Sequence, residues 1–125
     1  MSKDALPDIK WLSDVEEQDY PAAESYLTIL HSRDKVSKMM ARFRAAPVVK
    51  FKTVDIFRAC ELPLKSASNA QVKAERKKIS KGESLSPILL LRDEMHGKVV
   101  IADGYHRMCA VYEVDEETVI PCKII

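Results

Sequence analysis

Apolar residues recur with a helical period over the first third of the chain. Pro21 suits the first turn of a helix, and the following apolar residues predict a helix over 21–31. Ser32 is a favourable N-cap for a second helix, which we expect to end before Pro47. The apolar positions of the two predicted helices are Ala22, Ala23, Tyr26, Leu27 and Leu30, then Val36, Met39, Met40 and Phe43.

From Val48 the apolar period changes from helical to two. Val49 and Phe51 alternate with Lys50 and Lys52, a pattern typical of a half-buried strand. The next segment, Asp55–Leu62, predicts a short helix that opens with an aspartate cap and is ended by Pro63.

The second half of the chain alternates between a helix, strands and a further helix. Ser68-Asn69 is expected to cap a surface helix over about 70–81, which ends in a run of bases before Gly82. The aliphatic runs 88–91 and 99–102 flank a polar turn and predict a hairpin of two buried strands. The predicted elements after this hairpin are a glycine turn, a helix from about 105, and a final strand over 119–125 in which Pro121 favours an edge or a bulge.

This order of elements predicts a small α/β (α+β) domain with a mixed sheet and flanking helices. The length of 125 residues suits one domain, which we divide into an N-terminal helical extension (1–47) and a main domain (48–125). The three single cysteines do not form a disulfide framework, and the first residues have no apolar stretch typical of a secretory signal. No apolar run is long enough to span a membrane, so we expect a cytoplasmic protein without a membrane partner.

Charge is segregated along the chain although the net charge is only +1. Residues 1–24 carry seven acids and two bases, whereas residues 31–52 carry seven bases and one acid. The simplest interpretation is that both are solvated helix faces that partly neutralise each other. The alternative is a nucleic-acid contact through Arg33–Lys52 and the basic helix Lys73–Lys81.

The segment Asp103–Arg107, with the sequence DGYHR, is the strongest candidate for a binding site. A glycine turn that opens a helix presents free backbone N–H groups and the positive end of the helix dipole, both of which favour an anion. His106 and Arg107 add two donors, although bases are unfavourable at a helix N-terminus. Two structural alternatives remain open: Arg107 pairs with Asp103 or Glu113, and Asp103 is the N-cap of the helix.

The stretch SLSPILLLRDEMHGKVVIADGYHRMCAVY, followed by VIPCKII, resembles the ParB/sulfiredoxin-like superfamily. The resemblance covers residues 48–125 and lies in the order of elements around a short motif that opens a helix. It implies a nucleotide site on a small mixed α/β fold. The position of the sulfiredoxin cysteine is occupied by Tyr105, so sulfiredoxin chemistry is not expected, and Cys109, one turn further on, is expected to pack in the core.

Within the superfamily, the loop is similar to the D-G-H-H-R loop of ADP-dependent free-serine kinases. The two loops differ at Tyr105. The resemblance implies that Gly104, His106 and Arg107 hold phosphates, with Asp103 near the transferred group or a Mg²⁺ ion. We include Tyr105 in the expected binding loop, and the expected nucleotide is ATP, ADP or CTP. It also implies a catalytic glutamate after the first strand, for which Glu61 is the candidate by its order in the chain. Each acid has a simpler alternative: Asp103 as a helix cap, and Glu61 as a surface residue before Pro63.

The sequence thus predicts a nucleotide-binding domain and leaves open whether it hydrolyses the nucleotide or transfers a phosphoryl group. The alternative is a non-catalytic DNA-binding or protein-adaptor module. His31 and His96 have no ligand-like spacing to other side chains, so no protein metal site is expected. The extension could serve as a lid over the site, as a homodimer contact or as a protein-binding surface, and the sequence does not decide among these.

Overall fold

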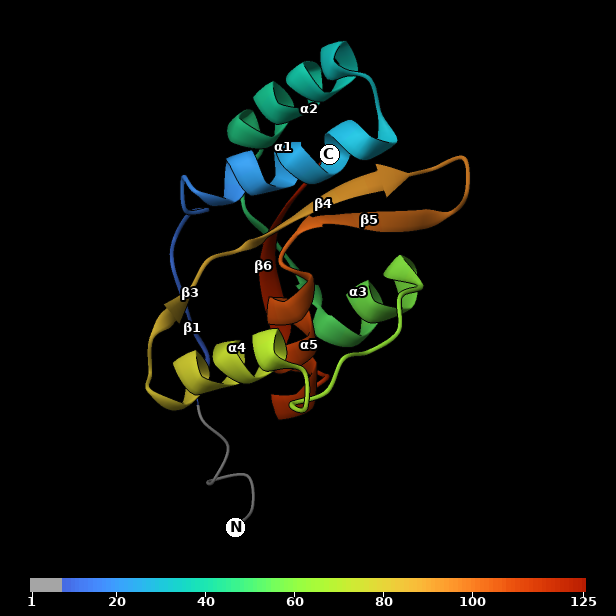
Figure 1. Cartoon of the computed structure of the whole chain (residues 1–125). Coiled ribbons are helices and arrows are strands. Elements are labelled where there is room, and N and C mark those ends of the chain that lie inside the picture. The colour runs from blue at the N-terminus through green and yellow to red at the C-terminus, as the bar shows by residue number, and fades with distance from the viewer. Residues whose placement is uncertain (1–7) are drawn as a thin grey trace.

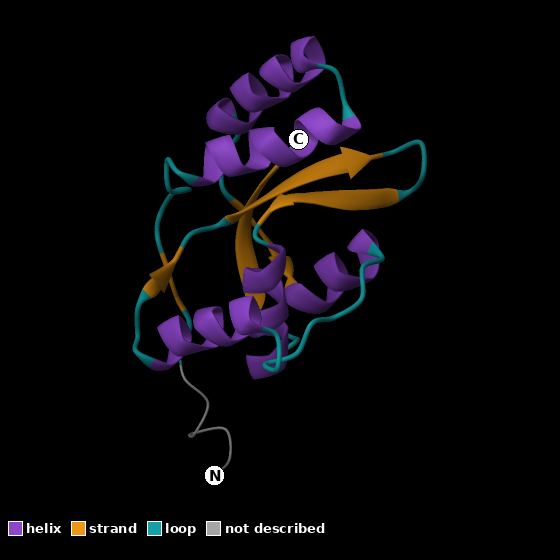
Figure 2. Ribbon diagram, viewed as in Figure 1, coloured by secondary structure: helices purple, strands orange, loops and turns teal. Residues whose placement is uncertain are grey.

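The computed structural model describes residues 8–125 and has the small α/β fold that the sequence predicts. A four-stranded mixed sheet lies between two groups of helices, with α1 and α2 on one face and α3, α4 and α5 on the other (Figures 1 and 2). The elements are β1 (Lys10–Trp11), α1 (Asp19–Leu30), α2 (Arg33–Ala45), β2 (Val49–Lys52), α3 (Thr53–Cys60), α4 (Ala70–Ser80), β3 (Ser84–Leu85), β4 (Ile88–Asp93), β5 (Lys98–Asp103), α5 (Tyr105–Val114) and β6 (Val119–Ile124). The predictions for residues 1–7, at the start of the acidic segment and of the extension, lie outside the described residues.

The strand order of the sheet is β2-β6-β4-β5. The pairs β2–β6 and β4–β5 are antiparallel, as predicted for the second pair, and β4–β6 is parallel. The expectation that Pro121 marks an edge strand or a bulge is wrong, because β6 is central and its register with β2 has no shift at Pro121. Its pairing with β4 begins only at Cys122, so Pro121 lies where the strand pairs with β2 alone and its missing N–H is tolerated.

The N-terminal extension packs against one face of the sheet. Ser32 caps α2 as predicted, its hydroxyl accepting a hydrogen bond from the Lys35 amide. In α1, however, only part of the predicted apolar face is buried: Ala23 and Leu27 lie in the core, whereas Tyr26 is 43% exposed. The core on this side consists of Val15, Tyr20, Ala23, Leu27, Val36, Met40, Phe43, Leu89, Leu91, Ala102 and Ile125.

Two further contacts connect the start of the described chain to the main domain. β1 pairs in parallel with β3, and Trp11 packs against the core on the α5 side of the sheet. These contacts pack the start of the extension into the fold.

Within the extension, Arg44 forms an ion pair with Glu17 at 2.9 Å, so the acidic and basic segments do partly neutralise each other.

The opposite face of the sheet carries the larger core and the three remaining helices. Asn69 caps α4 as predicted, accepting from the amides of Gln71 and Val72. The predicted aspartate cap of α3 is wrong: the helix begins two residues before Asp55, at Thr53, whose hydroxyl donates to the Thr118 carbonyl. The start of α3 is therefore held by a hydrogen bond to the turn before β6 instead of by a local side-chain cap.

All three cysteines are buried and free. Cys109 is fully buried, as expected for a packing residue, and burial raises the pKa of Cys122 to about 12. Buried thiols of raised pKa are poor nucleophiles, so they supply no catalytic group. Among residues 8–125, no helix is long and apolar enough to cross a bilayer.

Candidate functional site at the start of helix α5

The candidate loop is a sharp strand-to-helix turn that requires glycine. β5 ends at Asp103, and Gly104, with φ 110°, precedes the first residue of α5. A Cβ atom at this position would lie 2.4 Å from Cγ2 of Ile88, so no larger residue fits without a shift of the core. The helix cap is Gly104, without a side-chain hydrogen bond, so the interpretation of Asp103 as the N-cap is wrong.

An irregularity in the sheet lies directly before this turn. Ile101 pairs with Leu90 and Asp103 pairs with Leu89, which leaves Ala102 as an extra residue on β5. A bulge of this kind changes which face of the sheet the following side chain meets. It therefore helps to set the direction in which Asp103 leaves the strand.

Arg107 is turned toward the interior of the protein. Its side chain is only 14% exposed, and its Nη1 donates to the Ser86 carbonyl at 2.9 Å and more weakly to the Pro87 carbonyl at 3.4 Å. Its guanidinium also faces the carboxylates of Asp19 at 3.5 Å, Asp103 at 3.8 Å and Glu75 at 4.0 Å. Of the two predicted structural partners, Asp103 is present, whereas Glu113 pairs with Arg76.

The three carboxylates around one guanidinium form a crowded acidic cluster. Desolvation by burial raises the pKa of Asp103 to about 6, and the nearby Asp19 adds to this effect, while Arg107 opposes it. Among the described residues, Asp19 Oδ2 and Glu75 Oε1 are buried without a hydrogen-bond partner. Asp103 is thus a carboxyl group that changes its charge near neutral pH.

A pocket of about 310 Å³ lies beside the turn. Its lining combines the loop with apolar residues from α1, β5 and the segment after α3. Burial lowers the pKa of His106, as does nearby Lys65, so the imidazole is neutral at pH 7. The residues lining the pocket are Ala22, Tyr26, Leu62, Ile101, Ala102, Asp103, Gly104, Tyr105 and His106.

Tyr105 fixes one wall of the pocket. Its hydroxyl donates to the Pro63 carbonyl, which holds the segment after α3 against the start of α5. Its ring also lies 5.2 Å from that of His106, in a tilted arrangement. Tyr105 therefore shapes this wall of the pocket.

The structure brings together four of the six candidate residues at this pocket, namely Asp103, Gly104, Tyr105 and His106. Arg107 adjoins them through Asp103 but does not line the pocket. Glu61 lies on the surface in a left-handed turn, φ 56°, and is also outside the lining. Sequence reasoning missed the partners from distant segments, Tyr26, Leu62, Asp19 and Glu75, for which no local motif exists.

The residues do not form a metal site on their own. Within residues 8–125, no group of three or more histidine, cysteine, aspartate or glutamate side chains has the geometry to hold a metal ion. Asp103 is the only carboxylate in the pocket lining. A Mg²⁺ ion at this position would need most of its oxygen ligands from a phosphate and water.

The two basic segments lie on different sides of the protein. α2 covers one face of the sheet, and α4 lies beyond the other face (Figure 1). They therefore do not form the single phosphate-contacting surface that their sequence suggested. In α4, Arg76 and Lys78 are also engaged by Glu113 and Glu75.

No family model, curated protein or solved structure matches the chain.

Proposed function

We propose that the pocket at the start of α5 binds a nucleoside di- or triphosphate. The observation that carries this proposal is the composition of the pocket lining, which combines the start of α5, a helix without a side-chain cap, with apolar residues from other segments. Backbone N–H groups at a helix N-terminus favour phosphate oxygens. Tyr26 and Leu62, both exposed, offer apolar surface for a base.

The roles of the loop residues follow from their positions. Gly104 lets the backbone approach the phosphate, and His106 offers a neutral imidazole N–H as a donor. Arg107 acts as a positioning residue, because its donors are engaged by the carbonyls of Ser86 and Pro87 and by buried carboxylates. The similarity of DGYHR to the kinase loop supports the location of the phosphates. It also implies a direct contact between Arg107 and a phosphate, and the engaged guanidinium does not support that contact.

Asp103 makes nucleotide binding dependent on pH. Its carboxylate repels a phosphate when it is ionised, and this repulsion is removed below its pKa of about 6. The same group is the proton acceptor we assign for turnover. It would take the proton of a water or hydroxyl that attacks the terminal phosphorus. The new O–P bond forms as the bond from that phosphorus to the bridging oxygen breaks, and the nucleotide leaves with one phosphate fewer. Glu61 has no part in this proposal because it is outside the pocket.

The test is a binding measurement with ATP, ADP, CTP and GTP, with and without Mg²⁺, on the wild type, His106→Ala and His96→Ala. His96 is the matched control, because it lies in the β4–β5 turn and contacts Asp93 instead of the pocket. A nucleotide at 100 times its dissociation constant adds about 2.7 kcal/mol of apparent stability. We expect a thermal shift in the wild type and in His96→Ala, and a smaller shift in His106→Ala. Equal shifts in all three proteins, or none, would contradict the proposal.

A second candidate function is supported by the surface of α2. Four of its bases, Arg33, Lys35, Lys38 and Arg42, are exposed and form no ion pair within residues 8–125. Such a face suits the phosphate backbone of a nucleic acid, whose binding weakens steeply with salt. A DNA titration at two salt concentrations distinguishes the candidates, since Lys35→Gln with Lys38→Gln would weaken DNA binding and leave nucleotide binding intact. Absent binding at low salt rules this function out.

A further inference from the structure

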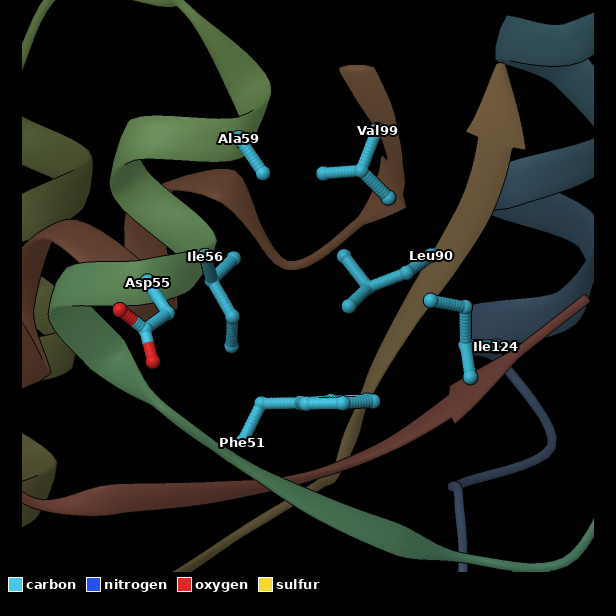
Figure 3. Close-up of a pocket in the computed structure, with 7 residues that line it drawn as sticks. All are labelled: Phe51, Asp55, Ile56, Ala59, Leu90, Val99 and Ile124. Atoms are coloured by element: carbon cyan, nitrogen blue, oxygen red, sulfur yellow. The ribbon is translucent and has the colours of Figure 1, made fainter. Parts of the chain in front are cut away.

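A second pocket, of about 210 Å³, lies on the α3 side of the sheet. Figure 3 shows apolar side chains from α3 and from all four strands of the sheet around an open space. Its lining is almost entirely apolar, and Leu90, Ile56 and Val99 at its base belong to the buried core. The apolar residues of the lining are Phe51, Ile56, Ala59, Leu90, Val99 and Ile124.

The pocket exists because α3 presents a small side chain to the sheet. Ala59 lies opposite Val99 across the open space (Figure 3), at a position where a larger residue would fill the gap. Protein cores are normally packed without such spaces. Water binds this space poorly, because a bound water molecule needs two or more polar partners and this lining has almost none.

One charged residue, Asp55, lies at the rim of the pocket. Its backbone and methylene group face the space, whereas its carboxylate points away from the centre (Figure 3). An occupant therefore meets no hydrogen-bonding group inside the pocket. The volume exceeds the roughly 150 Å³ of cavities that take up benzene and is below the range typical of drug-sized ligands.

We propose that this pocket is a binding site for a small apolar molecule built on one aromatic ring system. A neighbouring depression shares Ala59, Val99 and Ile124 with it and extends to the β4–β5 turn. It adds two bases and two acids, Arg92, Lys98, Asp93 and Glu94. A polar substituent on the ring has room there, while the ring itself fills the apolar end. The site is independent of the pocket at α5, since the two share no lining residue.

The test uses indole as the probe and purine as a polar ring system of the same size, with amide chemical shifts followed by NMR. We expect indole to bind the wild type with a dissociation constant of about 1 mM or lower, shifting the amides of Ala59, Val99 and Ile124. Purine should bind at least about tenfold more weakly, because its ring nitrogens lose their hydrogen bonds to water.

Two variants make the test specific. Ala59→Leu fills the pocket and should weaken indole binding at least about tenfold, with an unchanged or raised melting temperature. Ala41→Leu, on the exposed surface of α2, is the matched control and should bind indole as the wild type does. If Ala59→Leu does not fold, Ile124→Ala serves instead, and it should alter indole affinity by enlarging the same pocket. Unchanged binding in the folded pocket variant, equal binding of purine, or shifts outside this pocket would overturn the proposal.

Discussion

Arg107 Nη2 lies 3.5 Å from Asp19 Oδ2, which connects α5 of the main domain to the first turn of α1 in the N-terminal extension. Both side chains are largely buried, with exposed fractions of 14% and 8%. A buried charge is tolerated only when it is paired, so the extension and the candidate loop stabilise each other. The segment that the sequence predicts to bind a ligand thus also holds the extension and the main domain together.

Removal of Arg107 should therefore destabilise the protein. Arg107→Ala leaves the buried carboxylate of Asp19 without its counter-charge, and we expect the free energy of unfolding to fall by about 3–5 kcal/mol. Arg107→Lys keeps the charge but loses the hydrogen bonds to the Ser86 and Pro87 carbonyls, so it should cost less. Urea unfolding measures both. A loss below about 1 kcal/mol in Arg107→Ala, as for a surface ion pair, would contradict the structural role.

Glycine should be required at 104 and only moderately favoured at 97. Gly104→Ala places a Cβ atom 2.4 Å from Ile88, at φ 110°, and should cost at least about 3 kcal/mol from strain and overpacking. Gly97→Ala, at φ 63° with no neighbour within 4 Å, should cost only about 1–2 kcal/mol. Thermal unfolding of the pair compares them directly, and equal losses would show that the contact with Ile88 does not constrain the turn.

Asp103 should lower the stability of the protein at neutral pH. Its folded-state pKa of about 6 lies above the ordinary value of 3.8, so the folded protein holds this proton up to a higher pH than the unfolded chain does. The free energy of unfolding contributed by this group therefore falls as the pH rises from about 4 to about 6.

Asp103→Asn does not titrate, and it should be more stable than the wild type by about 1–3 kcal/mol at pH 7. This difference should shrink as the pH falls below 5. Urea unfolding of both proteins across pH 4–8 isolates Asp103, because the other carboxyl groups titrate in both. Asp34→Asn, at an exposed acid in α2, is the matched control for the change of an aspartate to an asparagine. An Asp103→Asn protein less stable than the wild type at pH 7 would contradict the raised pKa of Asp103.

Lys123 forms a second buried contact between the sheet and the extension. Its ammonium group, on a side chain only 4% exposed, donates to the Tyr20 hydroxyl at 3.0 Å and to the Arg44 carbonyl at 3.1 Å. Lys123→Met keeps the length of the side chain and loses both bonds together with the ion pair to Asp14 at 3.4 Å, which should cost about 1–3 kcal/mol. Hydrogen exchange should show that α1 and α2 open more readily than the rest of the protein. Exchange that is faster to the same extent throughout the Lys123→Met protein would contradict a local role of Lys123 in holding α1 and α2.

The sequence predicted most features that depend on neighbouring residues. The caps at Ser32 and Asn69, the hairpin and the start of α5 are all set by side chains within a few positions of the element concerned. The features it missed depend on partners far along the chain. Pro121 is tolerated in a central strand because β4 pairs with β6 only beyond it. Arg107 faces inward toward Asp19 and Glu75, which come from other helices.

The candidate site shows the same division. The turn at Gly104 was predictable, since a glycine before an amphipathic segment is a local signal. The apolar part of the pocket lining was not predictable, because Tyr26 belongs to a helix that reaches the loop only through tertiary packing. The spacing of apolar residues in α1 indicated a buried position for this tyrosine, whereas it is 43% exposed at the pocket rim.

The central claim is that a nucleotide binds with its phosphates at the start of α5, and an amide NMR titration with ADP tests it most directly. We predict that the largest shifts occur at Gly104, Tyr105 and His106, with smaller ones at Tyr26 and Leu62. We further predict tighter binding at pH 5.5 than at pH 7.5, and tighter binding by Asp103→Asn at pH 7.5, because the charge that repels phosphate is then absent. Shifts confined to α2 or to the pocket under α3, or no shifts at saturating ADP, would contradict the account.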